Sequence, residues 1–175
     1  MATHRTPVAG GFMLLMACCG WSGDVTHAQT GVRDRILGAW QLESRTVRTS
    51  GGEALSDPVL GERPAGRLFY DASGRMALQM MREARTQPIS APGRPADASN
   101  PRVILGYDAY FGTFRMNPRD GTITHHVEGS LFPEDLGKDF ERRLSVEGDT
   151  LTLLFTSRSP DGIEVTRTLR FRRLK

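Results

Sequence analysis

One short stretch, residues 122–132 (TITHHVEGSLF), holds the side chains best suited to chemistry. His125 and His126 stand next to each other, and Glu128 follows two residues later. An imidazole titrates near neutral pH and can act as an acid, a base, a metal ligand or a hydrogen-bonding group. Residues two apart on a β-strand share a face, so His126 and Glu128 could act together. This stretch is the first candidate for a functional site.

Strand alternation separates the two histidines. His125 lies on the apolar face of the stretch, whereas His126 and Glu128 share the opposite, polar face. We therefore expect His125 to point toward the core or a cavity. Gly129 could mark a β-bulge, and a one-residue shift of register would turn His126 and Glu128 inward instead.

Three interpretations of the histidines stay open. His125 could be a buried structural residue that is hydrogen-bonded by a neighbour or by water. His125, or His126 with Glu128, could orient a ligand in a mainly apolar pocket. A histidine could also act as a general acid or base, but no partner constellation such as a Gly-x-Ser-x-Gly elbow accompanies it. No metal site and no cofactor are predicted, because only His126 and Glu128 could coordinate together.

Most of the remaining sequence consists of short segments with strand-like alternation, separated by turn residues. The clearest hairpin turns at residues 71–74, where a first Asp and a last Gly fit a type I turn. No helix is expected beyond one turn near residues 133–136. We predict about eight strands, over residues 40–47, 67–70, 75–81, 107–116, 122–132, 140–146, 151–155 and 164–174.

These strands predict an all-β fold, an antiparallel up-and-down β-barrel of about eight strands. Closing sequential hairpins into a barrel removes the exposed sheet edges, and a barrel of this size can enclose one small ligand. Residues 29–35 form a short polar lead-in to the domain at 36–175. Residues 53–65 and 82–102 are predicted loops, and the second, which is long and rich in proline, could cover a barrel mouth.

Several further side chains could line a cavity. Tyr107 and Tyr110 lie in the most aromatic segment, and Arg142 interrupts an apolar stripe, where it could bind a ligand carboxylate or extend to water at a barrel end. In the first strand, alternation places one set of residues together (Trp40, Leu42, Ser44, Thr46) and the other set opposite (Gln41, Glu43, Arg45). A second apolar face could be core or a pocket wall (Met76, Leu78, Met80).

The first 28 residues predict export. A weakly basic start, an apolar run and the small residues of Thr26-His-Ala28 are typical of a secretory signal peptide, which indicates a periplasmic or secreted protein. The alternative is a lipoprotein anchored to the membrane through Cys18. Both cysteines lie in this leader, so cleavage after Ala28 would leave a mature domain without thiols. No transmembrane helix is expected in the mature chain.

The charge balance does not indicate a nucleic-acid-binding protein. The chain has 23 Lys and Arg against 20 Asp and Glu. The densest basic stretch, residues 167–175, alternates like a final strand with arginines on the solvated face and Leu169 and Phe171 on the other. Neither stacking aromatic residues nor a recognition motif accompany it. We expect a monomer whose partner is a small, largely apolar molecule.

Five sequence blocks resemble the bacterial and fungal lipocalin-like domain family. They are LGAWQL from Leu37, PAGRLFYDASGRMA from Pro64, YDAYFGTF from Tyr107, THHVEGSL from Thr124, and Leu144 with GDTLTL from Gly148. The resemblance spans about residues 36–174 and implies a lipocalin-like β-barrel with a central cavity. It does not imply a particular reaction, and no catalytic residue is transferred from it.

These observations predict an exported, lipocalin-like protein that binds a small, largely apolar ligand in its barrel. The sequence does not show a reaction. One alternative is an isomerase or cyclase that uses a barrel histidine for proton transfer. Another is a structural or interaction domain whose interior is filled by its own side chains.

Overall fold

The computed structural model describes residues 1, 31–57, 59–83, 106–117, 119–159 and 161–175. Nearly all of the predicted signal peptide and of the predicted loop at 82–102 lie outside these residues. The described chain is all-β. Its strands are β1 (Gly38–Thr49), β2 (Ala54–Leu55), β3 (Ala65–Tyr70), β4 (Arg75–Met81), β5 (Tyr107–Asn117), β6 (Thr122–Ser130), β7 (Asp139–Glu147), β8 (Thr150–Arg158) and β9 (Glu164–Arg173).

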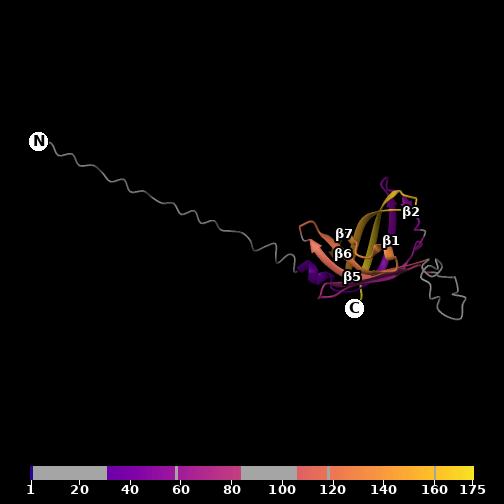
Figure 1. The fold of residues 1–175 in the computed structure, drawn as a ribbon, viewed down its shortest axis with the longest axis horizontal. Coiled ribbons are helices and arrows are strands. Elements are labelled where there is room, and N and C mark those ends of the chain that lie inside the picture. The colour runs from indigo at the N-terminus through magenta and orange to yellow at the C-terminus, as the bar shows by residue number, and fades with distance from the viewer. Residues whose placement is uncertain (2–30, 58, 84–105, 118, 160) are drawn as a thin grey trace.

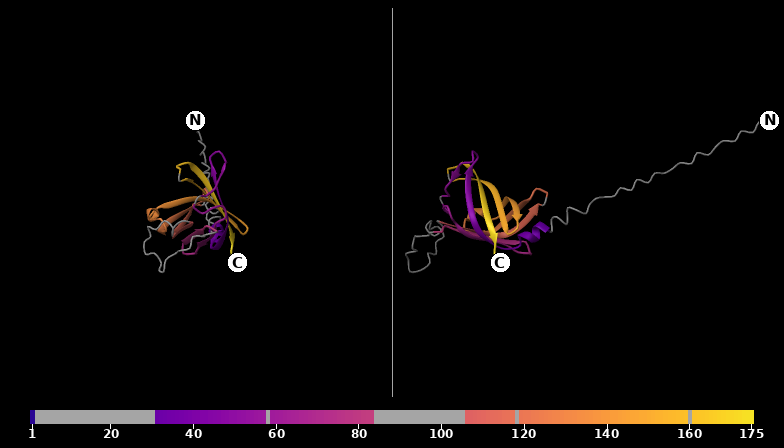
Figure 2. Two further views of the ribbon diagram at one scale, coloured as in Figure 1. Left: turned by 90° about the vertical axis from the view of Figure 1, so that its right-hand side faces the viewer. Right: turned by 180° about the vertical axis from the view of Figure 1, so that it is seen from behind.

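The strands form one antiparallel sheet that closes on itself. From β3 onward each strand pairs with the next along the chain, and β1 pairs with both β3 and β9. The curved strands of Figures 1 and 2 therefore enclose a barrel. The predicted up-and-down barrel of eight strands is confirmed by β1 and β3 to β9. The two-residue strand β2, which pairs with Val47 and Arg48 of β1, was expected to be loop.

The turns predicted at residues 71–74 and near residue 133 are both present, whereas the segment before β1 differs from its prediction. The β3–β4 turn is closed by the Gly74 amide, which donates to the Asp71 carbonyl oxygen over 3.2 Å, and Gly74 has the positive φ of 87° that favours glycine. The turn predicted near residue 133 is the 3-10 helix η1 (Pro133–Asp135). Residues 31–36 are helical, although no helix was expected there; they include most of the predicted polar lead-in at 29–35, and Ile36 at their end is fully buried.

One end of the barrel, here called the closed end, is packed with apolar side chains. The Trp40 indole N–H donates to the Ile36 carbonyl oxygen over 2.7 Å, which ties the helical segment across this end. The Arg173 guanidinium lies 4.2 Å from the centroid of the Trp40 ring and donates to the Leu37 carbonyl oxygen. Figure 1 shows this segment and β2 at opposite ends of the barrel. The closed end is defined by four residues with no exposed surface: Ile36, Trp40, Leu151 and Phe171.

A β-bulge in β1 corrects the predicted faces of the first strand. The register against β9 shifts between Leu42 and Ser44, so Glu43 is an extra residue on β1. Before the bulge Trp40 and Leu42 face inward as predicted. After it Arg45 and Val47 face inward, whereas Ser44 and Thr46 do not continue the buried face. The prediction that Arg45 lies on the outer face is wrong, because a bulge reverses the alternation of every residue that follows it.

A second bulge lies in β6, after the histidines. Gly112 of β5 pairs with Val127 and Phe111 pairs with Gly129, which leaves Glu128 as the extra residue. The strands approach so closely here that a Cβ on Gly112 would lie 1.9 Å from the His126 carbonyl oxygen. The bulge expected near Gly129 is therefore present. It does not exchange the histidines, because both precede it, and His125 faces inward as predicted.

Candidate functional site

The barrel contains a cavity of about 830 Å³ at the end opposite the helical segment. We call this region the cavity end. Its wall combines apolar and charged side chains in similar measure. The apolar and aromatic members are Leu78, Met80, Tyr110, Phe132, Phe140, Phe155 and Leu169, and the charged members are Arg45, Asp108, Asp135, Asp139, Glu141, Arg142, Arg158 and Arg167.

Four of the ten residues predicted to bind a ligand line this cavity: Leu78, Met80, Tyr110 and Arg142. Leu78 and Met80 lie on the inward face of β4. This face contributes both to the core and to the cavity wall, which were predicted as alternatives. The third member of that face, Met76, lies in the apolar core away from the cavity, as does Trp40.

The other four predicted residues lie elsewhere. The Tyr107 hydroxyl donates to the Gln79 side-chain oxygen over 2.9 Å at the surface. His126 is on the outer face of β6, where its Nδ1 lies 2.7 Å from a carboxylate oxygen of Asp139. Glu128 is exposed at the bulge. The structure therefore separates His126 and Glu128 from the cavity, and His125 lies just behind the cavity wall.

His125 is fully buried between two tyrosines. Its Nε2 lies 2.7 Å from the Tyr70 hydroxyl oxygen, and its Nδ1 lies 2.8 Å from the Tyr110 hydroxyl oxygen. Burial, and then the nearby positive charge of Arg142, hold the pKa of His125 well below its usual value of 6.5. The imidazole is therefore neutral at physiological pH, and both ring nitrogens are engaged. Tyr110 both lines the cavity and forms a hydrogen bond with His125.

Arg142 extends from β7 into an aromatic enclosure. Its Nη2 donates to the Tyr110 hydroxyl oxygen over 3.1 Å. The guanidinium carbon lies 4.3 Å from the centroid of the Phe155 ring and 5.1 Å from that of Phe140. Aromatic faces attract a cation through their quadrupole, and this attraction partly replaces the lost hydration. Only 8% of Arg142 is exposed, so the alternative of a side chain extending to water is wrong.

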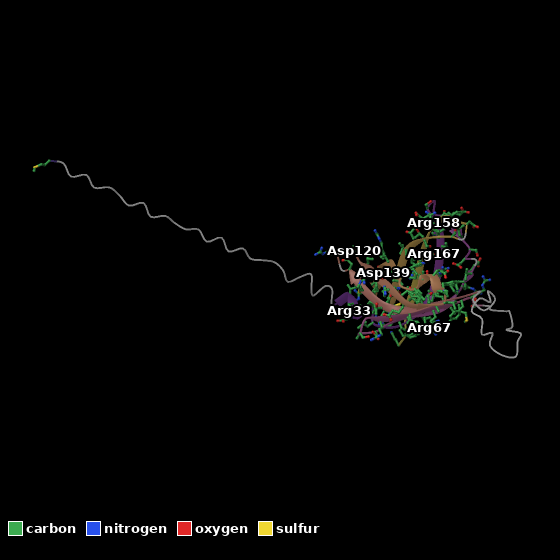
Figure 3. The ribbon with its side chains drawn as sticks, in the orientation of Figure 1. Arg33, Arg67, Asp120, Asp139, Arg158 and Arg167 are labelled. Atoms are coloured by element: carbon green, nitrogen blue, oxygen red, sulfur yellow. The ribbon has the colours of Figure 1, made fainter. Side chains whose placement is uncertain are left out.

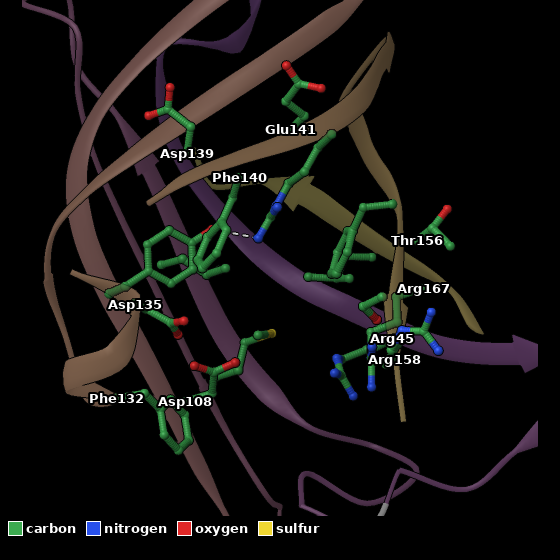
Figure 4. A pocket seen from close by; sticks show the side chains of 17 residues that line it. Arg45, Asp108, Phe132, Asp135, Asp139, Phe140, Glu141, Thr156, Arg158 and Arg167 are labelled. Carbon is green, nitrogen blue, oxygen red and sulfur yellow. Dashed lines mark hydrogen bonds between the residues drawn. The ribbon is translucent and has the colours of Figure 1, made fainter. Parts of the chain in front are cut away.

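Three charged residues that sequence reasoning missed also face the cavity. Arg45 forms an ion pair with the carboxylate of Asp57, which is buried and also accepts the amide hydrogens of Val59 and Leu60. Burial, and then the charge of Arg167, lower the pKa of Arg45 to about 10, so it stays protonated at neutral pH. Figure 4 shows Arg45 and Arg167 together on one side of the cavity, with Asp108 on the other.

The alternation of side chains along a strand could have identified two of these three residues, Arg167 and Asp108. Arg167 shares the inward face of β9 with Leu169 and Phe171, so the prediction that the arginines of this strand are solvated is wrong for Arg167. Figure 3 shows Arg158 and Arg167 in one region, away from Arg33 of the helical segment. Asp108 is likewise two residues from the buried Tyr110 on β5, so alternation places both side chains on the same face. Arg45 could not be found in this way, because the bulge at Glu43 reverses its face.

Asp108 is the carboxylate on the inner wall that has neither an ion pair nor a hydrogen bond with another described residue. Burial raises its pKa, while the positive charges of Arg45, Arg142 and Arg167 oppose that rise. The described residues contain no group of three His, Cys, Asp or Glu side chains that could hold a metal ion. The polar side chains of this wall can form hydrogen bonds and ion pairs.

The sequence profile of the lipocalin-like domain family matches residues 37–174. The chain belongs to the lipocalin-like domain family. The resemblance carried by the five sequence blocks is confirmed, and a lipocalin-like barrel with an internal cavity is in general a ligand-binding domain. A search of curated proteins finds no significant match. None of the described helical segments is long and apolar enough to cross a membrane.

Proposed function

We propose that this lipocalin-like protein binds a small, largely apolar organic molecule in its barrel cavity. The observation that carries the proposal is the cavity of about 830 Å³, enclosed by strands and walled on several sides by aliphatic and aromatic side chains. Ligand sites of small molecules are typically concave, mainly apolar and of this size, with a few polar groups that fix orientation. Leu78, Met80 and Leu169 supply the apolar wall, and Tyr110 and Arg142 supply polar groups.

The cavity also argues against a barrel filled by its own side chains. Apolar side chains fill the closed end, but the same inward faces leave space beyond Tyr110. Protein interiors are close-packed, and voids larger than a few water molecules are uncommon in a core that serves stability alone. A cavity of this size that opens from the inside of the barrel supports a binding function.

The most direct experiment is native mass spectrometry of the protein purified from its own host, followed by denaturation and identification of any released molecule. A Met80→Trp variant fills the cavity and is expected to abolish retention of that molecule. Met81→Trp is the matched control, because Met81 is the next residue of β4 and faces outward. Equal retention by the two variants would overturn the proposal.

The same experiment separates binding from catalysis. The isomerase or cyclase alternative requires a group that reaches a substrate, but both nitrogens of His125 are engaged by tyrosine hydroxyls and His126 lies on the outer face. Binding alone predicts that a molecule returned to the purified protein keeps its structure. An isomerised or cyclised product, formed faster with the protein than with the Met80→Trp variant, would favour the enzyme instead.

We propose in addition that the protein is exported and acts as a monomer. The support is the order of basic start, apolar run and small residues before position 28. Intact-mass measurement of the protein from its host is expected to show a chain that begins at Gln29. A lipidated chain that begins at Cys18 would support the lipoprotein alternative, and a chain that retains residues 1–28 would contradict both. Analytical ultracentrifugation tests the monomer.

A further inference from the structure

A chain of hydrogen bonds runs from the closed end of the barrel to the cavity wall. It passes from the Tyr70 hydroxyl to Nε2 of His125, and from Nδ1 of His125 to the Tyr110 hydroxyl, over 2.7 and 2.8 Å. His125 is neutral at physiological pH because its pKa is low. A neutral imidazole donates through one nitrogen and accepts through the other. The chain therefore has a direction.

The neutral imidazole accepts a hydrogen bond from only one of the two tyrosine hydroxyls. The other tyrosine must donate its hydrogen elsewhere, and which tyrosine this is determines the direction of the chain. If His125 donates to Tyr70, the hydrogen of Tyr70 needs another acceptor among apolar neighbours, where the Phe114 ring lies 4.8 Å away. Tyr70 has no further hydrogen-bond partner in the described part of the chain, and a buried donor without an acceptor is costly. If Tyr70 donates instead, the hydrogen left over belongs to Tyr110. Only the cavity can provide water or a ligand oxygen as its acceptor.

Arg142 places a second donor at the same point. The Tyr110 oxygen then accepts two hydrogen bonds, from Nδ1 of His125 and from Nη2 of Arg142, while its own hydrogen points to the cavity side. Burial raises the pKa of the Tyr110 phenol, so it keeps this hydrogen at neutral pH. The phenol is thus a fixed donor beside a guanidinium.

The cavity wall also holds arginines that are not neutralised by a direct ion pair. Asp57 is paired with Arg45. Arg142 and Arg167 have no ion pair with any other described residue, although four carboxylates line the same cavity: Asp108, Asp135, Asp139 and Glu141. A buried cation without a direct partner is costly, and an anionic group of a ligand beside the buried Arg142 would supply that partner.

We infer that the ligand carries a carboxylate, and that the Tyr110 hydroxyl and the Arg142 guanidinium bind it. The inference rests on the proposed function, because it names the polar end of the molecule held in the same cavity. Tyr70 and His125 are positioning residues, since they act by directing the Tyr110 hydrogen. Charge-assisted hydrogen bonds of this kind are about twice as strong as neutral ones and give orientation as well as affinity.

Two probes of the same shape test the carboxylate. Isothermal titration calorimetry at pH 7.5 compares 2-naphthoate with 2-naphthamide, which lacks the charge. The naphthoate is expected to bind at least about tenfold more tightly. Tyr110→Phe and Arg142→Met are each expected to remove most of that preference, because they weaken naphthoate binding far more than naphthamide binding. Arg170→Met is the control, because Arg170 lies on the exposed face of β9.

The outcomes separate this inference from the proposed function. Equal affinities for the two probes, with Met80→Trp abolishing both, would overturn the carboxylate and leave small-molecule binding intact. A preference for naphthoate that survives in Tyr110→Phe would overturn the assigned site. If Arg142→Met does not fold, Tyr110→Phe still decides the matter. Failure of both probes and absence of a co-purifying molecule would contradict the proposed function itself.

The direction of the chain has its own readout. Nuclear magnetic resonance of protein labelled with ¹⁵N-histidine is expected to show the His125 proton on Nδ1 at pH 7. Tyr70→Phe removes the donor to Nε2, so a larger share of the Nε2–H tautomer and a weaker preference for naphthoate are expected. A His125 proton found on Nε2 in the unaltered protein would overturn the positioning role of Tyr70.

Discussion

The two ends of the barrel are built from the same eight strands but are stabilised by different forces. At the closed end, inward positions carry Trp40, Leu151 and Phe171, which have no exposed surface. At the cavity end, inward positions of the same strands carry Arg45 on β1 and Arg167 on β9. Apolar groups fill space and exclude water, whereas charged groups need partners and leave room for them. The comparison shows how one sheet provides both a stable core and a binding site.

The largest contrast is expected between two phenylalanines. Phe171→Ala should lower the free energy of unfolding by about 3–5 kcal/mol, because it opens a void in the packed end. Phe155→Ala should cost less than half of that, because Phe155 already borders a cavity, and it should weaken binding of 2-naphthoate through loss of the ring over Arg142. Urea denaturation measures both. Equal costs would show that the two ends are packed alike.

The ion pair between Arg45 and Asp57 is expected to stabilise the cavity end, and replacing Arg45 removes it. Arg45→Met should cost roughly 3 kcal/mol, because it leaves the buried Asp57 carboxylate without its cation. The double variant Arg45→Met with Asp57→Asn should recover part of the loss, since the uncompensated charge is gone. The measurement is again urea denaturation at pH 7. A double variant no more stable than the single one would contradict this account.

Removal of one hydroxyl from each end sharpens the comparison. Tyr70→Phe should cost about 1–2 kcal/mol, because Nε2 of His125 loses its partner where water cannot replace it. Tyr110→Phe should cost less, since water in the cavity can reach the groups that are left. Thermal denaturation of the two variants without ligand provides the test. A larger loss for Tyr110→Phe would reverse the assignment of the buried and accessible ends of the chain.

The smallest expected effect is a dependence on pH. Below about pH 6.5 the unfolded chain takes up a proton on His125, whereas the folded protein does not, because the folded pKa is depressed. The stabilising contribution is therefore complete above pH 6.5 and is lost as the pH falls, at a slope of up to about 1.4 kcal/mol per pH unit. The groups that face His125 are the hydroxyls of Tyr70 and Tyr110, whose pKa values are raised by burial, and the guanidinium of Arg142.

His125→Gln provides the reference for that slope, because glutamine can bond to both tyrosines and does not titrate. The difference in unfolding free energy between the two proteins is expected to shrink steadily from pH 6.5 to pH 5. Asp108, whose pKa is raised by burial, contributes with the opposite sign at lower pH, but it is present in both proteins and cancels. A difference that stays constant would mean that His125 titrates alike in both states.

Local residue patterns were enough to predict the strands and most of their inward and outward faces. Turn residues such as Asp71 and Gly74 act locally, and alternation over residues 122–127 fixed the inward side of His125 because a strand has a period of two. These are short-range properties, so they could be predicted without knowing what each strand pairs with. The closure of the strands into a barrel was predicted from the sequential hairpins, whose closure removes exposed sheet edges, and the family resemblance implies the same fold.

The composition of the candidate site depends on contacts between strands that are far apart in the sequence. Arg45 faces the cavity because β1 bulges at Glu43 against β9, a partner more than a hundred residues away, and no local pattern encodes that register. The low pKa of His125 arises in the same way, from a tyrosine on β3, another on β5 and an arginine on β7 that meet only when the barrel closes. Burial and charge pairing depend on every residue that is close in space. Most of these residues are far apart in the sequence, so local sequence patterns do not reveal them.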